Sequence, residues 1–130
     1  GVVDPAEPGA EARRRRARLV DAGRRGLSVA GSDSGGGAGI QADIKAIGRA
    51  GGFPTTAITA LTAQNTLGVR AVQVTRAEMV AEQIAAVAED IGVDAIKTGM
   101  LATPELVWLV AECLRTAPLD GAPIGVDTVL

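Results

Sequence analysis

The sequence predicts an α/β fold with a mostly parallel sheet, and two observations support this. Short apolar runs alternate along the chain with segments in which apolar residues recur at helical spacing, and the stretches between them are short. Strands that alternate with helices pair in parallel and are joined by right-handed crossovers. With 130 residues, the chain is long enough for one domain core and too short for two ordinary domains.

The first strand and helix are expected between residues 27 and 51. The apolar run 27–31 predicts a buried strand, and the glycine-rich stretch 32–39 predicts a turn. The apolar residues that follow predict the buried face of a helix: Ile40, Ile44 and Ile47. On this periodicity alone Asp43 lies on the solvated side of the helix, which is expected to end near Gly51.

The pattern then repeats. A strand is expected over 55–61, with the polar residues 62–66 leaving its carboxyl end, and a second short strand over 71–74. Thr75 and Glu78 form a capping-box pattern at the start of the next helix. The apolar stripe of that helix is Val80, Ile84, Val87 and Ile91.

The last elements follow the same order. A strand over 94–98 leads into a loop over 99–102, and Thr103 as N-cap with Pro104 at the first helical position opens a helix. The buried face of this helix is predicted to be Leu106, Val110 and Leu114. One more strand begins over 123–127.

A small-molecule site is expected where the strands end, because parallel sheets bind ligands outside the carboxyl ends of their strands. The polar or glycine-rich segments that fall there are 31–39, 62–66, 98–101 and 127–128. The glycine stretch matches neither the dinucleotide-binding nor the P-loop pattern. It serves either as an anion or substrate contact at a helix N-terminus or as a purely structural turn, and the pattern leaves both open.

Composition excludes several classes of function. The absence of histidine and the single cysteine exclude the usual zinc sites, histidine-dependent triads and a disulfide framework. One Trp, one Phe and no Tyr leave too few aromatic rings for a base-stacking platform, so no nucleic-acid partner is expected. No apolar stretch is long enough to span a membrane, and we expect a cytoplasmic protein.

Charge separates the beginning of the chain from the rest. Residues 1–26 contain seven arginines and four acidic residues, whereas residues 27–130 contain six basic and eleven acidic residues. We interpret 1–26 as an Arg-rich tail or linker and 27–130 as the folded region. Because the chain begins with glycine, we expect a processed product or a fragment.

Four motifs resemble those of the hydroxymethylpyrimidine/phosphomethylpyrimidine kinases, thiamine-biosynthesis enzymes of the ribokinase-like superfamily. They are AGSDSGGGAGIQAD at 30–43, ITALTAQNT at 58–66, GML at 99–101 and VDTV at 126–129. The resemblance covers about residues 27–130 and implies the N-terminal half of a ribokinase-like three-layer fold. It implies phosphoryl transfer from MgATP to the hydroxymethyl group of 4-amino-5-hydroxymethyl-2-methylpyrimidine, and then to its monophosphate.

The resemblance also implies roles for individual residues. Gln64 corresponds to the glutamine that binds the pyrimidine, which suits an amide because it offers a donor and an acceptor together. Asp43 corresponds to the acid near the hydroxymethyl group, and Asp127 to an acid near Mg²⁺ and the phosphates. The other substrate contacts implied are Gly31, Ala38 and Met100. Asp33 either serves the metal in the same way or caps the glycine turn.

The family's anion hole, catalytic base and most of its ATP surface are not found in these 130 residues, so no catalytic residue is expected here and we expect the chain alone to be inactive. A homodimer or a fusion to another thiamine enzyme is expected as its assembly. Three alternatives remain: a pyridoxine/pyridoxal kinase, a non-catalytic pyrimidine-binding half-domain, and a half-domain that folds only with a complementary chain.

Overall fold

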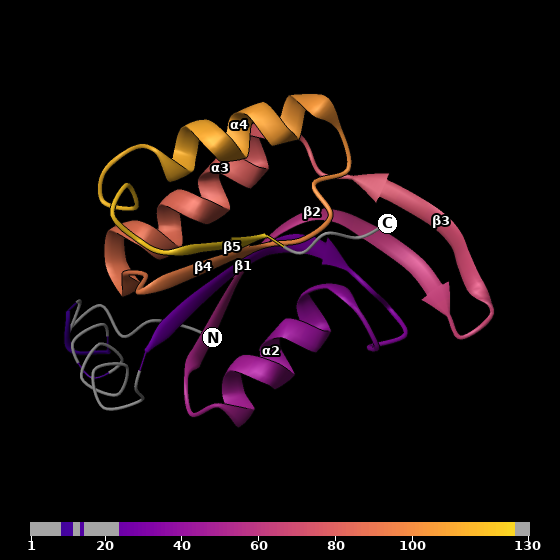
Figure 1. Ribbon diagram of the computed structural model, residues 1–130, viewed down its shortest axis with the longest axis horizontal. Helices are drawn as coiled ribbons and strands as arrows, with labels where there is room; N and C mark the ends of the chain where they lie inside the picture. Colours follow the sequence, from indigo (N-terminus) through magenta and orange to yellow (C-terminus); the bar gives the residue numbers. More distant parts are fainter. Residues whose placement is uncertain (1–8, 12–13, 15–23, 127–130) are drawn as a thin grey trace.

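The structure, a computed structural model, describes residues 9–11, 14 and 24–126. Its strands and helices alternate along the chain, apart from one hairpin (Figure 1). The strands are β1 (Arg25–Ser32), β2 (Phe53–Asn65), β3 (Gly68–Val74), β4 (Ala95–Thr98) and β5 (Ile124–Val126). The helices are α2 (Gly39–Arg49), α3 (Ala77–Ala86), the π-helical turn η1 (Val87–Ile91) and α4 (Pro104–Leu114).

The described strands form one sheet in the order β3-β2-β1-β4-β5, with β1 at its centre. β1 pairs in parallel with β2 and with β4, and β4 pairs in parallel with β5. Figure 1 shows α2 on one face of the sheet and α3 with α4 on the other. The prediction of an α/β fold with a mostly parallel sheet is therefore confirmed.

One connection departs from the prediction. β2 and β3 are antiparallel neighbours, so residues 62–65 belong to a strand and not to a loop, and the strand expected at 71–74 begins at Gly68. The turn between them is too short for a crossover, which excludes parallel pairing. The polar residues of β2 were misleading because the outer part of this hairpin is largely exposed, so its strands need no apolar face.

The core lies between the sheet and the pair α3–α4. The predicted faces of these helices are buried at Val80, Ile84 and all three predicted residues of α4, and they pack on Leu27, Val29 and Ile96 of the sheet. In η1 the wider π turn brings Ala88 into the core, while Val87 and Ile91 are only partly buried.

Two local predictions for the helices have different outcomes. At α4, Thr103 is the N-cap and its hydroxyl accepts a hydrogen bond from the N–H of Leu106, as predicted. At α3 the capping box is wrong, because the helix begins one residue later, with Arg76 at the N-cap and no side-chain cap. The backbone N–H of Thr75 instead donates to the carbonyl of Thr59 in β2, so Thr75 continues the pairing of β3 with β2 and does not begin the helix.

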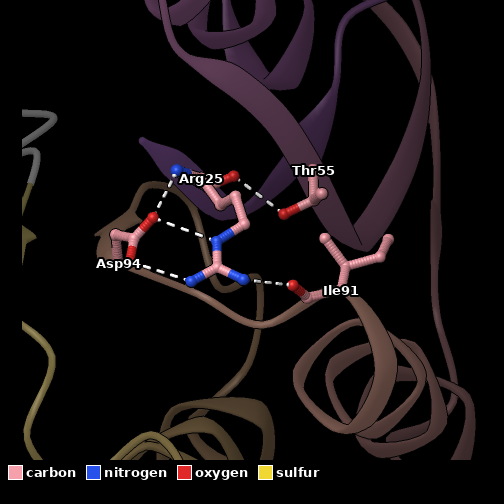
Figure 2. Close-up of polar contacts among 5 residues, drawn as sticks. Arg25, Thr55, Ile91 and Asp94 are labelled. Atoms are coloured by element: carbon pink, nitrogen blue, oxygen red, sulfur yellow. Dashed lines mark hydrogen bonds and ion pairs between the residues drawn. The ribbon is translucent and has the colours of Figure 1, made fainter. Parts of the chain in front are cut away.

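Arg25 joins three elements at the amino edge of the sheet (Figure 2). Its guanidinium binds both carboxylate oxygens of Asp94 at 3.0 and 3.1 Å and donates to the carbonyl of Ile91 at 2.6 Å. These bonds hold the start of β1 against the end of η1 and the start of β4. The guanidinium and the backbone N–H of Arg25 lower the pKa of Asp94 to about 2.

Gln83 of α3 completes the hydrogen bonding of β2 where β3 has already ended. Its amide oxygen accepts from the N–H of Ile58 at 2.9 Å, and its amide nitrogen donates to the carbonyl of the same residue at 3.1 Å. The side chain thus replaces a strand partner at this position. None of the helices in the described ranges has the length and apolar character needed to cross a membrane.

Candidate functional site

A cavity of about 300 Å³ lies at the carboxyl edge of the sheet. Its walls come from the end of β1, the glycine-rich turn, the first turns of α2, the β2–β3 hairpin and the loop after β4. The lining residues are Ala30, Gly31, Ser32, Asp33, Ala38, Gly39, Asp43, Thr62, Gln64, Val69, Lys97, Gly99 and Met100. Three of the segments expected to converge therefore meet in one place, while 127–128 lie outside the described residues.

Asp33 organises the glycine-rich turn. Its carboxylate accepts hydrogen bonds from the backbone N–H groups of Gly35 at 2.7 Å, Gly37 at 3.1 Å and Ala38 at 2.9 Å. A helix N-terminus of this kind attracts anions, and here the anion is a side chain of the protein itself. The geometry thus supports the structural-turn interpretation and gives Asp33 the role of capping the turn.

Two glycines in the wall have close neighbours. Gly39 has φ +59°, and a Cβ there would lie 2.3 Å from the carbonyl oxygen of Gly31. Gly31 in turn faces Met100, whose methyl group would be 2.7 Å from an added Cβ. Gly39 therefore requires glycine for the turn to close, whereas at Gly31 the flexible end of the Met100 side chain could move aside.

Gln64 lies in β2, where Ser34 holds its backbone. The Ser34 hydroxyl accepts from the N–H of Gln64 and donates to its carbonyl, each at 2.7 Å. The Thr62 hydroxyl donates to the carbonyl of Ser32 at 2.7 Å and lies 3.2 Å from the amide oxygen of Gln64. Its amide side chain is thereby placed in the cavity wall with hydrogen-bonding groups suited to a heterocycle.

Asp43 is buried, with 8% of its side chain exposed, so its solvated placement by periodicity is wrong. One carboxylate oxygen accepts from the Ser28 hydroxyl at 2.6 Å, and the other is paired with the ammonium group of Lys97. The buried residues of α2 are Ile40 and Asp43, whereas Ile44 is 39% exposed. Asp43 can face the sheet because Ser28 and Lys97 provide polar partners for its carboxylate there.

All five substrate residues predicted from the sequence line the cavity: Gln64, Asp43, Gly31, Ala38 and Met100. Their roles in binding stay predictions. Thr62, which also lines the cavity, belongs to the predicted segment 62–66, whereas Lys97 was not anticipated. A lysine inside the apolar run of β4 was a signal that could have marked Lys97 as a polar residue with a buried partner.

A magnesium site is not shown by the described residues. They contain no group of three or more His, Cys, Asp or Glu side chains placed to share a metal ion. The two carboxylates of the cavity have partners within the protein, three N–H groups for Asp33 and Ser28 with Lys97 for Asp43. The Mg²⁺ prediction depends on Asp127, which lies outside the described residues.

The lone cysteine takes no part in this cavity. Cys113 lies on α4, in a crevice between α3 and α4, where burial raises the pKa of its thiol. The thiol is therefore largely protonated at neutral pH.

Comparison with known proteins gives consistent results. The profile of the family described as phosphomethylpyrimidine kinase matches residues 33–130. The chain is 52% identical over 103 residues to the hydroxymethylpyrimidine/phosphomethylpyrimidine kinase of Mycobacterium bovis, covering 79% of this chain and 37% of that protein. It is 45% identical over 126 residues to a thiamine biosynthesis multifunctional protein of Corynebacterium efficiens, covering 93% of this chain and 17% of that protein.

Solved structures agree with the sequence comparisons. The crystal structure of phosphomethylpyrimidine kinase from Clostridium difficile superposes with a TM-score of 0.75 at 43% identity, covering 81% of this chain and 45% of that one. Pyridoxal kinase of Bacillus subtilis, solved as an ADP complex, gives a TM-score of 0.74 at 34% identity, covering 82% and 40%. The chain thus spans less than half the length of each of these relatives.

Proposed function

Since the chain belongs to the phosphomethylpyrimidine kinase family, we propose that it supplies the pyrimidine-binding part of a kinase of thiamine biosynthesis. The reaction is transfer of a phosphoryl group from ATP to the hydroxymethyl group of 4-amino-5-hydroxymethyl-2-methylpyrimidine. A second transfer to the monophosphate gives the pyrophosphate.

The observation that carries this proposal is the convergence of five separately placed residues on one cavity. Gln64 from β2 offers an amide, Asp43 from α2 offers a carboxylate, and Met100 after β4 offers an apolar wall. An aminopyrimidine presents a donor and an acceptor side by side along one edge, which matches the two groups of an amide. The hydroxymethyl group fits a carboxylate that accepts its O–H.

The 130 residues by themselves are proposed to bind the pyrimidine without phosphorylating it. Phosphoryl transfer needs donors and cations arranged around the transferred group. In the described part of the chain, the Asp33 carboxylate already accepts hydrogen bonds from the N–H groups of the glycine turn, and Lys97 is paired with Asp43. These groups are therefore committed within the protein and do not form an anion hole.

A pyridoxal kinase activity is the second candidate, because the fold superposes almost equally well on pyridoxal kinase of B. subtilis. Identity favours the pyrimidine kinases, at 43% for the C. difficile structure against 34% for the pyridoxal kinase. Fusion to another thiamine enzyme remains part of the proposal, supported by the multifunctional relative of C. efficiens.

The test is an ATP-dependent phosphorylation assay with the pyrimidine, its monophosphate and pyridoxal as substrates. It is run on the chain alone and on the chain joined to the carboxyl-terminal part of the M. bovis kinase, with that kinase as positive control. We expect the joined protein to phosphorylate the pyrimidine and the chain alone to be inactive. Preference for pyridoxal, or no pyrimidine turnover by a folded joined protein, contradicts the proposal.

A further inference from the structure

An ion pair between Asp43 and Lys97 forms part of the cavity wall. Ser28 of β1 and Lys97 of β4 are direct partners in the register of the two parallel strands. Both side chains therefore leave the sheet on the same face, the one covered by α2. Asp43 of α2 receives them both, one at each carboxylate oxygen.

The pair is asymmetric in its burial. Only 8% of the Asp43 side chain is exposed, against 37% for Lys97, and both residues line the cavity. A carboxylate this deeply buried is strongly disfavoured unless a cation and hydrogen-bond donors accompany it. Lys97 supplies the cation and Ser28 the donor, so the position of the carboxylate depends on both.

The carboxylate keeps acceptor capacity for a ligand. Each of its oxygens has two lone-pair directions, and each has one protein partner in this network. A hydroxyl group placed in the cavity can therefore donate to Asp43 without displacing Ser28 or Lys97.

We propose that Lys97 is a positioning residue of the pyrimidine site, which acts through its ion pair by holding the Asp43 carboxylate where it accepts a hydrogen bond from the hydroxymethyl group. This inference rests on the proposed function and adds a residue to it. In this proposal Lys97 acts on the ligand through Asp43 and not by a contact of its own. Its effect on binding therefore depends on the presence of the Asp43 carboxylate.

The test is a double-mutant cycle with binding as the readout. The affinity for 4-amino-5-hydroxymethyl-2-methylpyrimidine is measured by calorimetry for the full chain and for Lys97→Met, Asp43→Asn and the double variant. We expect each single variant to bind roughly tenfold more weakly, as for loss of a charge-assisted contact. The double variant is expected to bind no more weakly than Asp43→Asn, because the proposed effect of Lys97 is exerted through the Asp43 carboxylate.

A structural effect is separated from a positioning effect by a control. Asp94→Asn lies at the opposite edge of the sheet and is expected to lower the thermal stability without changing the affinity of the folded chain. If Lys97→Met does not fold, Lys97→Gln, which lacks the charge but keeps a hydrogen-bond donor, takes its place in the single and the double variant.

Three outcomes overturn the inference. Wild-type affinity in folded Lys97→Met shows that no positioning is needed. A further tenfold loss from Asp43→Asn to the double variant shows that Lys97 contacts the ligand directly. Absence of binding by the folded wild-type chain overturns the proposed function, and this inference with it.

Discussion

Replacing Asp94 with asparagine removes the carboxylate that Arg25 holds at the amino edge of the sheet, and the structure predicts both the size and the pH dependence of the loss. The arginine lowers the pKa of Asp94 from 3.8 to about 2, mainly through the side-chain hydrogen bonds and then through the backbone N–H of Arg25. At about 1.4 kcal/mol for each tenfold change in protonation equilibrium, this difference would be worth roughly 2.4 kcal/mol without screening. Both side chains are about one third exposed, at 33% and 35%, and solvent reduces the contribution to about 1 kcal/mol.

The direction of the pKa change determines how the stabilisation by Asp94 depends on pH. Because the pKa of Asp94 is lower in the folded than in the unfolded chain, its contribution is fully present above about pH 4 and is lost as the pH falls toward 2. The free energy of unfolding of Asp94→Asn is therefore expected to lie about 1 kcal/mol below that of the wild type at pH 7 and at pH 5. At pH 3 the difference should fall to roughly half.

Urea unfolding followed by far-ultraviolet circular dichroism at pH 7, 5 and 3 measures this difference. Glu112→Gln is the matched control, because its ion pair with Arg115 is 67% and 73% exposed and is expected to change stability by less than about 0.5 kcal/mol. A wild-type-to-variant difference that stays constant or grows as the pH falls would refute the assigned role of the Arg25–Asp94 pair.

The remaining predictions concern other contacts. Gly39→Ala should lower the free energy of unfolding by at least about 2 kcal/mol, because a left-handed backbone and the carbonyl of Gly31 leave no room for a Cβ; a thermal transition unchanged from wild type would contradict this. Gln83→Ala should lower it by about 1–2 kcal/mol by leaving the backbone of Ile58 without a partner, and faster amide exchange at Ile58 is the direct readout. Thr103→Ala should lower it by about 1 kcal/mol through loss of the α4 cap, with Thr103→Ser retaining most of the stability; equal losses in the two variants would exclude capping as the cause.

The elements that the sequence predicted well are those in which local pattern and tertiary packing agree. The apolar run of β1 lies at the centre of the sheet, where both faces are covered. The stripe Leu106, Val110 and Leu114 is buried, and Thr103 with Pro104 begins the helix as expected. In these segments the same residues satisfy helix or strand preference and burial at once.

The errors occur where a distant partner decides the outcome. The last residues of β2, 62–65, are mostly polar and are not buried, so no apolar run marks them as strand; their pairing with β3 is what makes them one. Asp43 is buried because Ser28 and Lys97, fifteen and fifty-four residues away, supply its hydrogen bonds. Periodicity along the sequence reveals neither partner, because it concerns only residues close together in the chain.

The predicted site residues converge for a topological reason. Gln64, Met100 and Gly31 follow or end neighbouring strands, and the carboxyl ends of parallel strands meet at one edge. Lys97 was missed because it lies inside a strand and its importance depends on which helix covers that face of the sheet. Convergence was therefore predictable from topology, whereas the contacts of individual side chains were not.

The central claim, that this cavity binds an aminopyrimidine through Gln64, is tested most directly by calorimetric titration of the purified chain with 4-amino-5-hydroxymethyl-2-methylpyrimidine. Gln73 of β3 provides the matched control, since it is a glutamine of the same hairpin that does not line the cavity. We expect one ligand to bind per chain, Gln64→Ala to bind at least about tenfold more weakly, and Gln73→Ala to bind as the wild type does. Equal affinities for wild type and Gln64→Ala, or no binding by a wild-type chain whose circular dichroism shows it to be folded, would contradict the claim.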